Sequence, residues 1–273
     1  MTVFLRAVVS LVLAVLTCGA NPAAAETIRI GGVGAVSGLL DALAAPFARY
    51  TGGTDRLVVI PGLGSGGAIA ALSAGAISLA VSGRPLMRKE MERGLMGIPF
   101  VETPLVFAVA ASAAPALSAE DVVAIHAGQT EAYASGEPVR IILRSRNETD
   151  VLLILGGIDG MAAALAKARQ RPDLPVAATD RENMDYARQI PGAFTTMSLI
   201  QMRTEPNALK SALYNGVEPT LANWRSGAYP LGFRLSLIYR TVTTAGARRF
   251  LAFLSTPEAA SIAERTGAVL SLP

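Results

Sequence analysis

Short apolar runs alternate with helix-like patterns in the first third of the chain. Each run is rich in β-branched residues and ends at a glycine, and each helix-like pattern repeats small and apolar side chains three or four residues apart. This alternation is typical of β-α-β units, so we expect an α/β fold class with parallel strands in this part of the chain. The expected strands cover residues 27–32, 57–62 and 77–83, and the expected helices cover residues 37–52 and 67–75.

A change of composition at Pro104 divides the sequence. An apolar strand at residues 103–111 leads into a loop of small residues, and a second apolar strand at residues 233–240 precedes the closing segment. Between these strands, Ser118 and Asp121 form a helix start that resembles a capping box. The other elements expected in the middle segment are strands at residues 138–150, 176–180 and 191–199 and a helix at residues 159–170.

The first 25 residues have the pattern of a secretory signal peptide. Arg6 supplies a basic start, residues 7–16 form an apolar stretch, and alanines at 23–25 offer a cleavage site. Ten residues are too few to span a bilayer, which takes roughly 20, so a membrane anchor is a less favoured alternative. Cys18 resembles the cysteine of a lipoprotein box, but Thr17 stands where that box has a smaller residue. We therefore expect cleavage after residue 25 and release into the periplasm, with lipid attachment as the less favoured alternative.

Charge and composition exclude several classes of function. Without the first 25 residues the chain keeps 23 basic and 21 acidic residues, far from the dense positive charge of a nucleic-acid binder. It then keeps no cysteine and one histidine, His126, so no disulfide or thiolate metal site can form and a zinc site is not expected. We expect neither a metal nor a cofactor, and no nucleic-acid partner.

The glycine-rich loop GLGSGG at residues 62–67 joins an expected strand to an expected helix. It lacks the lysine of a phosphate-binding P-loop and the third glycine of a dinucleotide fingerprint at the required spacing. A nucleophile elbow needs glycine two residues before Ser65, where Leu63 stands, and His126 lies in another segment, so a serine hydrolase is a remote alternative. Two interpretations stay open: a plain tight turn, or a cradle in which helix N–H groups and Ser65 bind an oxyanion.

Arg144 and Arg146 follow an apolar strand, at the edge where α/β proteins build their sites. An arginine there offers a planar fork of donors that suits a tetrahedral oxyanion. The alternative is an ion pair between Arg144 and an adjacent acid such as Glu148. Ser37 starts an expected helix after a glycine-rich turn, where its hydroxyl either contacts a ligand or only caps the helix.

In their order along the chain these motifs resemble the PstS-like periplasmic phosphate-binding proteins of ABC transporters. The resemblance runs from about Ile28 to Leu270, and it depends on the series of motifs and not on any single one. The similar segments are IGGVGAVSG at residues 30–38, GLGSGG through SGRPL at 62–86, LSAEDVVAIHAGQ at 117–129, VRIILRSRNETD at 139–150, PGAF at 191–194, YPLGFRLSLIYR at 229–240 and the closing segment from residue 250.

The resemblance implies a two-lobed type II periplasmic binding fold, with two crossing hinge strands and the ligand between the lobes. Lobe one would comprise residues 26–105 plus 232–273, and lobe two residues 106–231. Ser37, Ser65 and Arg144 fall on ligand-contacting positions of the family. The other candidate ligand-binding residues lie in or beside the same motifs and are Gly64, Gly66, Ser82, Arg84, Glu148 and Thr149.

Two departures from the family pattern concern the ligand. Gly83 stands where the family has an aspartate after serine, and Glu148-Thr149-Asp150 stands where it has S-G-T. Such an aspartate accepts the proton of phosphate and repels sulfate. Its absence, next to Arg84, predicts that sulfate or a similar dianion binds within about tenfold of phosphate. In the alternative, Glu148 or Asp150 supplies the acceptor from the opposite lobe.

The resemblance thus implies a periplasmic solute-binding protein that is monomeric and not an enzyme. It would capture phosphate or a similar oxyanion and deliver it to the permease of an ABC transporter. The alternative is a periplasmic interaction or sensor protein with a degenerate ligand cleft, because Glu148 and Asp150 would repel an anion.

Overall fold

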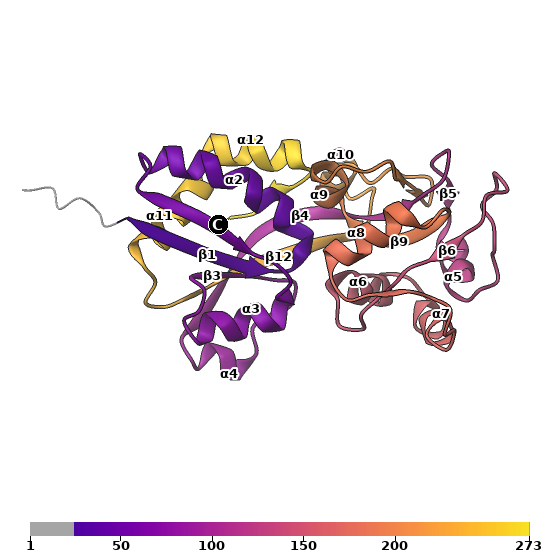
Figure 1. The fold of residues 1–273 in the computed structure, drawn as a ribbon, viewed down its shortest axis with the longest axis horizontal. Coiled ribbons are helices and arrows are strands. Elements are labelled where there is room, and N and C mark those ends of the chain that lie inside the picture. The colour runs from indigo at the N-terminus through magenta and orange to yellow at the C-terminus, as the bar shows by residue number, and fades with distance from the viewer. Residues whose placement is uncertain (1–24, 273) are drawn as a thin grey trace, which may run out of the picture.

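The computed structural model describes residues 25–272, so most of the predicted signal peptide, with Cys18, lies outside the described residues. Two lobes lie side by side along the long axis of the molecule, and two long strands run between them (Figure 1). Each lobe combines strands with helices. The predicted α/β architecture is therefore present in both halves.

Lobe one is an open sheet with helices on both faces. Its strands lie in the order β2-β1-β3-β12-β4, in which β1 pairs in parallel with β2 and β3, and β12 pairs antiparallel with β3. Helices α2, α11 and α12 cover one face and α3 covers the other (Figure 1). The bounds are β1 (Glu26–Gly32), α2 (Ser37–Tyr50), β2 (Asp55–Ile60), α3 (Gly64–Ser73), β3 (Leu79–Ser82), α4 (Arg88–Met91), β4 (Leu95–Val109), β12 (Gly232–Arg240), α11 (Ala245–Leu254) and α12 (Pro257–Thr266).

Aromatic side chains join helices from the two ends of the chain. Phe47 of α2 packs edge-on against Phe250 of α11, with ring centroids 5.1 Å apart, and Phe253 lies 5.7 Å from Phe47. All three rings are fully buried. Because these rings contribute both area burial and ring–ring contact, they attach the C-terminal helices to the N-terminal half of lobe one.

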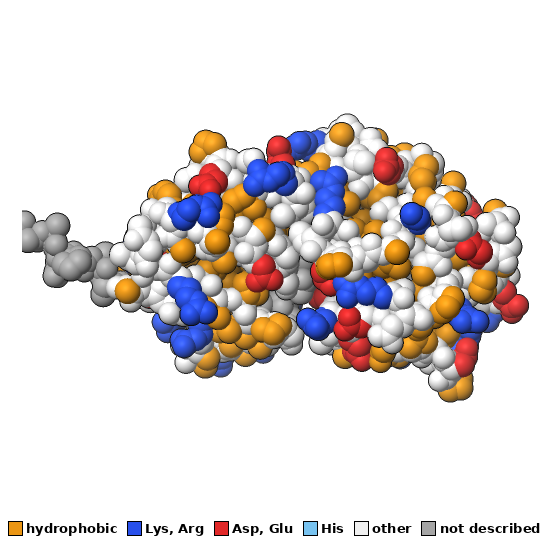
Figure 2. Space-filling model, turned by 45° about the horizontal axis from the view of Figure 1, so that its top comes forward, with side chains coloured by type: hydrophobic (Ala, Val, Ile, Leu, Met, Phe, Trp, Pro, Cys, Tyr) orange, Lys and Arg blue, Asp and Glu red, His pale blue; other side chains and the backbone are white. Residues whose placement is uncertain are grey.

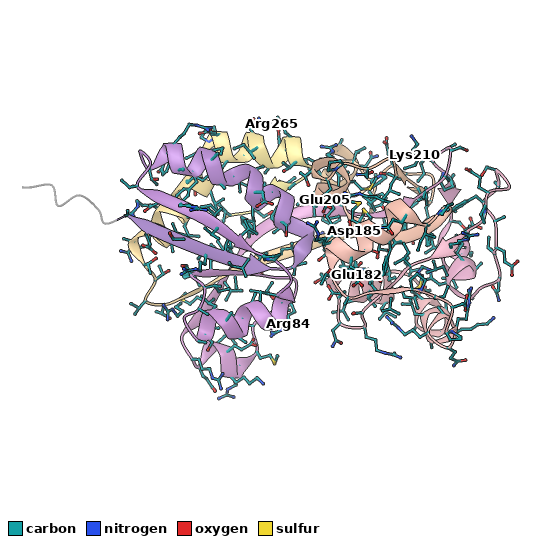
Figure 3. All side chains as sticks on the ribbon, viewed as in Figure 1. Arg84, Glu182, Asp185, Glu205, Lys210 and Arg265 are labelled. Atoms are coloured by element: carbon teal, nitrogen blue, oxygen red, sulfur yellow. The ribbon has the colours of Figure 1, made fainter. Side chains whose placement is uncertain are left out.

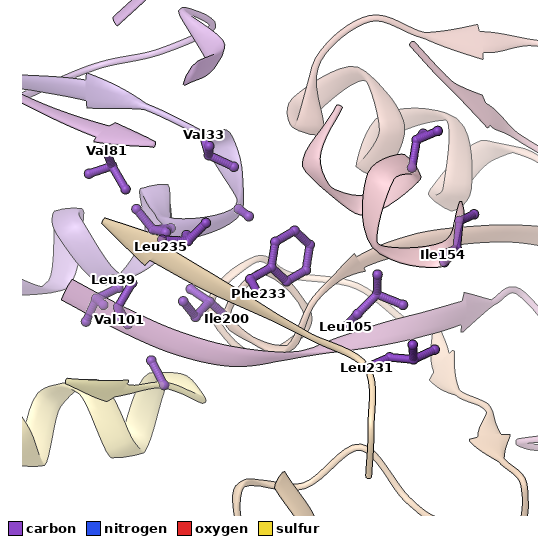
Figure 4. Close-up of a cluster of buried hydrophobic side chains, with 14 of the residues drawn as sticks. Val33, Leu39, Val81, Val101, Leu105, Ile154, Ile200, Leu231, Phe233 and Leu235 are labelled. Carbon is purple, nitrogen blue, oxygen red and sulfur yellow. The ribbon is translucent and has the colours of Figure 1, made fainter. Parts of the chain in front are cut away.

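Strands β4 and β12 connect the lobes. Residues 95–104 of β4 pair antiparallel with β12, and residues 105–109 of the same strand pair with β9 (Ala193–Ser198) in lobe two. The Leu105 N–H donates to the Leu231 carbonyl at 3.0 Å, so the two crossings lie next to each other. Figure 4 shows Phe233 of β12 between the lobes, with Leu105 and Leu231 beside the crossing. These are the positions predicted for the hinge strands, and their hinge motion stays a prediction.

Lobe two surrounds the far end of β4 and β9 with helices and very short strands. Helix α9, although its residues fall in the segment predicted as lobe two, packs against α2 and α12 of lobe one. Two short elements belong to lobe one, η1 (Gly34–Val36) and β13 (Val269–Leu270), which pairs with β4. The remaining elements are β5 (Ala116–Leu117), α5 (Ala119–His126), β6 (Arg140–Ile141), β7 (Leu143–Arg144), α6 (Thr149–Gly157), α7 (Met161–Ala168), β8 (Val176–Ala177), α8 (Asp180–Gln189), α9 (Leu199–Thr204), β10 (Lys210–Ser211), β11 (Leu213–Tyr214) and α10 (Leu221–Arg225).

One expected strand is wrong. The segment 138–150 holds only β6, which pairs with β9, and β7, which pairs with β8, because its consecutive apolar residues serve two different sheets. Glu148 then takes an extended conformation at the start of α6, and Asp150 lies in the first turn of that helix. Negative side chains favour a helix N-terminus. The charged end of the segment is therefore a helix start.

The aromatic cluster predicts a large loss of stability when one ring is removed. We expect Phe250→Ala to lower the free energy of unfolding by about 3–5 kcal/mol, because it removes a buried ring and leaves a cavity between α2 and α11. Urea denaturation followed by circular dichroism measures the change. Val242→Ala is the control, since Val242 is 86% exposed and its truncation should have almost no effect. Equal stabilities of the two variants would contradict the role of the cluster.

Candidate ligand-binding cleft

A cavity of about 800 Å³ opens between the two lobes. Figure 2 shows acidic side chains on both sides of the furrow where the lobes meet, and Figure 3 places Asp185 and Glu205 at the same junction. The cavity wall carries five carboxylates and two guanidiniums, so its charge is negative. The lining residues with side chains that can bind or repel a solute are Ser37, Asp41, Glu148, Thr179, Asp180, Arg181, Asp185, Arg188, Thr204 and Glu205.

Lobe one presents two helix N-termini to this cavity. Strands β1 and β2 are parallel, so their carboxyl ends meet at one edge of the sheet, where α2 and α3 begin. Ser37 and Gly38 at the start of α2 and Gly64 at the start of α3 line the cavity. The first N–H groups of a helix have no partner within the helix and carry partial positive charge. This wall can therefore donate hydrogen bonds to an anion.

Lobe two presents a buried arginine surrounded by acids. The Arg144 Nε donates to Asp150 at 3.0 Å, and its Nη2 donates to Asp180 at 2.9 Å and to Glu148 at 3.5 Å. Its Nη1 donates to the carbonyl oxygens of Ala177 and Thr179. The guanidinium is 2% exposed, and three carboxylates share its single positive charge. The cluster therefore carries excess negative charge when all three acids are ionised.

Asp180 crosses the boundary between the lobes. A Cβ atom on Gly34 would overlap Oδ2 of Asp180, so this carboxylate rests directly on the lobe-one backbone where a side chain is missing. The pKa of Asp180 is raised to about 7, chiefly by burial and also by the charges of Asp150 and Glu148, although Arg144 and the Gly34 amide lower it. Burial likewise raises the pKa of Glu148. The carboxylate of Asp180 thus exchanges its proton near neutral pH.

The structure brings only part of the predicted site to the cavity. Ser37, Gly64 and Glu148 line it, whereas the other predicted residues are not among its lining residues. Arg144 lies behind Asp180, which confirms the ion pair with Glu148 that was the alternative for this residue and adds two further acids. The remaining predicted residues outside the cavity lining are Ser65, Gly66, Ser82, Arg84 and Thr149.

Several of these residues bond to neighbours. Ser65 Oγ accepts the Gly83 N–H at 3.0 Å, and Ser82 Oγ bonds to the backbone of Arg84. Arg84 forms a two-point ion pair with Glu90, whose pKa its hydrogen bonds lower to about 2. Its guanidinium is thus neutralised locally.

Gly83 has a packing role that the sequence does not reveal. A Cβ atom at Gly83 would overlap Oγ1 of Thr149 at the start of α6, so glycine permits the two lobes to touch here. An aspartate at this position, as in the resembled family, would not fit this arrangement.

Asp180 and Gly34 were missed by sequence reasoning. A signal for Asp180 exists: Thr179 and Glu182 have the spacing of a capping box, and the Thr179 hydroxyl accepts the Glu182 N–H at 3.1 Å. That pattern predicts the start of α8 at Asp180. The contact with Arg144, 36 residues away, has no such signal.

Within residues 25–272, the acidic and histidine side chains form no group placed to hold a metal ion, and no helix is long and apolar enough to cross a membrane. His126 is buried in lobe two, where its Nδ1 donates to the Val122 carbonyl and burial lowers its pKa. It is therefore not available as a base for Ser65 in lobe one.

A family model described as "PBP superfamily domain" matches residues 19–258. The chain belongs to the PBP superfamily. A search of curated protein sequences found no significant match.

Solved structures share the fold of this PBP superfamily domain at low sequence identity. A Clostridium perfringens protein, assigned as a phosphate ABC transporter substrate-binding protein and solved with bound phosphate, has a TM-score of 0.74 and 14% identity over 90% of this chain and 99% of that chain. An ABC-type phosphate transport receptor from Vibrio cholerae has a TM-score of 0.62 and 17% identity, covering 90% and 100%. The ancestral soluble variant of the human phosphate-binding protein has a TM-score of 0.66 and 15% identity, covering 91% of each chain. The predicted two-lobed periplasmic-binding fold is confirmed.

The raised pKa of Asp180 predicts how stability depends on pH. The folded protein holds the Asp180 proton more tightly than the unfolded chain does. The protonated side chain therefore contributes to the free energy of unfolding in full below about pH 4, and this contribution is lost as the pH rises through 7. We expect Asp180→Asn to raise the free energy of unfolding by on the order of 1–3 kcal/mol at pH 8 and by much less at pH 5. Urea denaturation at both pH values tests this.

Asp150→Asn is the contrasting variant. Asp150 accepts hydrogen bonds from Arg144, Thr196 and the Val151 N–H, so its replacement should destabilise the protein at pH 8. A loss of stability in Asp180→Asn at pH 8 would contradict the excess of negative charge around Arg144.

Proposed function

We propose that this PBP superfamily domain is a periplasmic solute-binding protein that captures a small, phosphate-like oxyanion between its lobes for an ABC transporter. The observation that carries the proposal is that donors on the two sides of the cleft already hold an oxyanion, the carboxylate of Asp180. Arg144 donates to it from lobe two, and the Gly34 backbone lies against it from lobe one. Carboxylate and phosphate oxygens use the same charge-assisted donors.

The relatives support the same class of ligand. Each of the three solved structures named above is described as a phosphate-binding or phosphate transport protein, and each is covered by this chain over at least 91% of its length. Capture of a solute is favoured over hydrolysis by Ser65, because the one histidine of the sequence, His126, is buried in lobe two and bonded to Val122.

A second candidate is a periplasmic sensor or interaction protein with a cleft that no longer binds anions. The three carboxylates around Arg144 favour it, because like charges oppose an anionic solute. Thermal-shift measurements with phosphate, sulfate, molybdate and amino acids separate the two candidates, since a ligand that binds the folded state raises its melting temperature. Stabilisation by an oxyanion supports solute binding, and no stabilisation by any of the oxyanions favours the sensor.

Ser37 provides the residue-level test of this function. Ser37 lines the cavity at the first turn of α2, so we expect Ser37→Ala to weaken phosphate binding about tenfold, the loss that follows from one hydrogen bond to a charged group. Isothermal titration calorimetry measures the affinity. Ser73→Ala at the far end of α3 is the control and should bind like the wild type. Unchanged affinity in Ser37→Ala would remove this helix start from the site.

A further inference from the structure

Asp180 occupies a position that an anionic solute would need. Its Oδ1 accepts from Arg144 Nη2 at 2.9 Å, and its Oδ2 lies so close to Gly34 that even a methyl group there would overlap it. A carboxylate and a free oxyanion cannot use the same two donors at once. The side chain is 18% exposed and lines the cavity, so it lies at the entrance to Arg144 and not beneath it.

We propose that Asp180 is a tethered competitor of the solute and a latch between the lobes, so that an oxyanion binds only when the Asp180 carboxylate leaves Arg144 and Gly34. The proposal rests on the oxyanion-binding function proposed above. Because the carboxylate is attached to the chain, it competes at a high effective concentration whatever the solute concentration is. Asp180 then determines how strong a ligand must be to close the cleft.

The contact joins two bodies that can separate. Arg144 and Asp180 belong to lobe two, and Gly34 belongs to lobe one between β1 and α2. Gln201 Nε2 also donates to the Asp180 carbonyl at 3.4 Å, which helps to keep the start of α8 at the boundary. Without solute, the contact between Asp180 and Gly34 favours the closed arrangement.

Protonation should weaken the competition with an anionic solute. A neutral carboxyl is a poor partner for a guanidinium, and the Asp180 proton exchanges near pH 7. The charged groups that face Asp180 come from every element packed around it and are Arg144 of β7, Glu148 and Asp150 at the start of α6, Asp41 of α2, Arg181, Asp185 and Arg188 of α8, and Glu205 after α9. Among them Arg144 is the group within hydrogen-bond distance of its carboxylate.

Sulfate is the probe for competition, because its charge does not change between pH 5.5 and 8. Calorimetry compares wild type, Asp180→Asn and Asp173→Asn; the last removes one carboxylate of lobe two that is 65% exposed and outside the cavity lining. With a pKa of about 7, Asp180 is about 10% neutral at pH 8 and almost fully neutral at pH 5.5.

We therefore expect wild type and Asp173→Asn to bind sulfate about tenfold more tightly at pH 5.5 than at pH 8. Asp180→Asn should bind at least tenfold more tightly than wild type at pH 8 and show almost no change with pH. Equal or weaker binding by Asp180→Asn would overturn the proposal. A selective loss of phosphate binding in that variant would do so too, since it would mean that Asp180 accepts a proton from the ligand.

The latch has a readout that needs no ligand. Cysteines placed at Arg88 on α4 and at Gln170 after α7, both exposed, carry spin labels, and the only natural cysteine is Cys18 in the predicted signal peptide. We expect the label distance in wild type to be shorter at pH 5.5 than at pH 8, because the raised pKa of Asp180 means that this arrangement holds the proton more tightly than one in which the side chain is solvated. In Asp180→Asn the label distance should not change with pH.

The outcomes separate this proposal from the one on which it rests. If neither phosphate nor sulfate binds any of the variants, the oxyanion-binding function is wrong and the proposed competition by Asp180 is wrong with it. In that case the label distances alone show whether Asp180 holds the lobes together. If anions bind wild type and Asp180→Asn equally and the label distance is the same in both, the function stands and the role of Asp180 is overturned.

Discussion

The pairing of β4 with β12 fixes how the two lobes stand to each other. One strand, β4, pairs nine of its residues with β12 in the sheet of lobe one and five with β9 in the sheet of lobe two, and β12 returns beside it. A shift of one residue in this register would turn every side chain of β12 to the opposite face. Phe233 and Leu235 are both buried in the core, so such a shift would be strongly opposed. The cleft therefore has walls at defined positions, with α2 and α3 on one side and α6 and α8 on the other.

Close approach of the lobes depends on glycine. Gly34 and Gly83 leave room for Asp180 and Thr149 from the opposite lobe, and any side chain at either glycine would overlap them. At Gly83 the consequence is chemical as well as steric, since the family resemblance would put a carboxylate there. The three carboxylates around Arg144 instead come from lobe two. The negative charge of a carboxylate is thus supplied from the other wall of the cleft, where it can interact with Arg144.

The buried arginine shows why three acids can share one cation. Asp150 is satisfied by hydrogen bonds from Arg144, Thr196 and its own helix start. Asp180 has fewer donors and a raised pKa, so it can release the excess charge by taking up a proton. Burial of all three as full charges would be unfavourable without such compensation. The cluster therefore combines one ion pair with several hydrogen bonds, Arg144–Asp150, with a carboxyl group, Asp180, that exchanges its proton near neutral pH.

The candidate site was only partly predictable from sequence. Ser37 and Gly64 were predicted and line the cavity, because a glycine turn between a strand and a helix exposes the helix start at the sheet edge, a local consequence of chain geometry. Arg84 was predicted as a ligand-binding residue, but its guanidinium pairs with Glu90, six residues away in a loop and helix turn that periodicity does not define. Asp180 was missed because the helix start at Thr179 was not recognised, although the capping-box spacing was present.

By itself the sequence determined the alternating strands and helices of residues 27–83 and the glycine turns between them, because these follow from patterns within about 15 residues. The tertiary structure alone decided which polar groups remain free. Arg144 meets Asp180 across 36 residues, and Asp180 meets Gly34 across the boundary between the lobes. Whether a donor is available to a solute depends on every group packed around it, and that packing exists only after the lobes have assembled on β4 and β12.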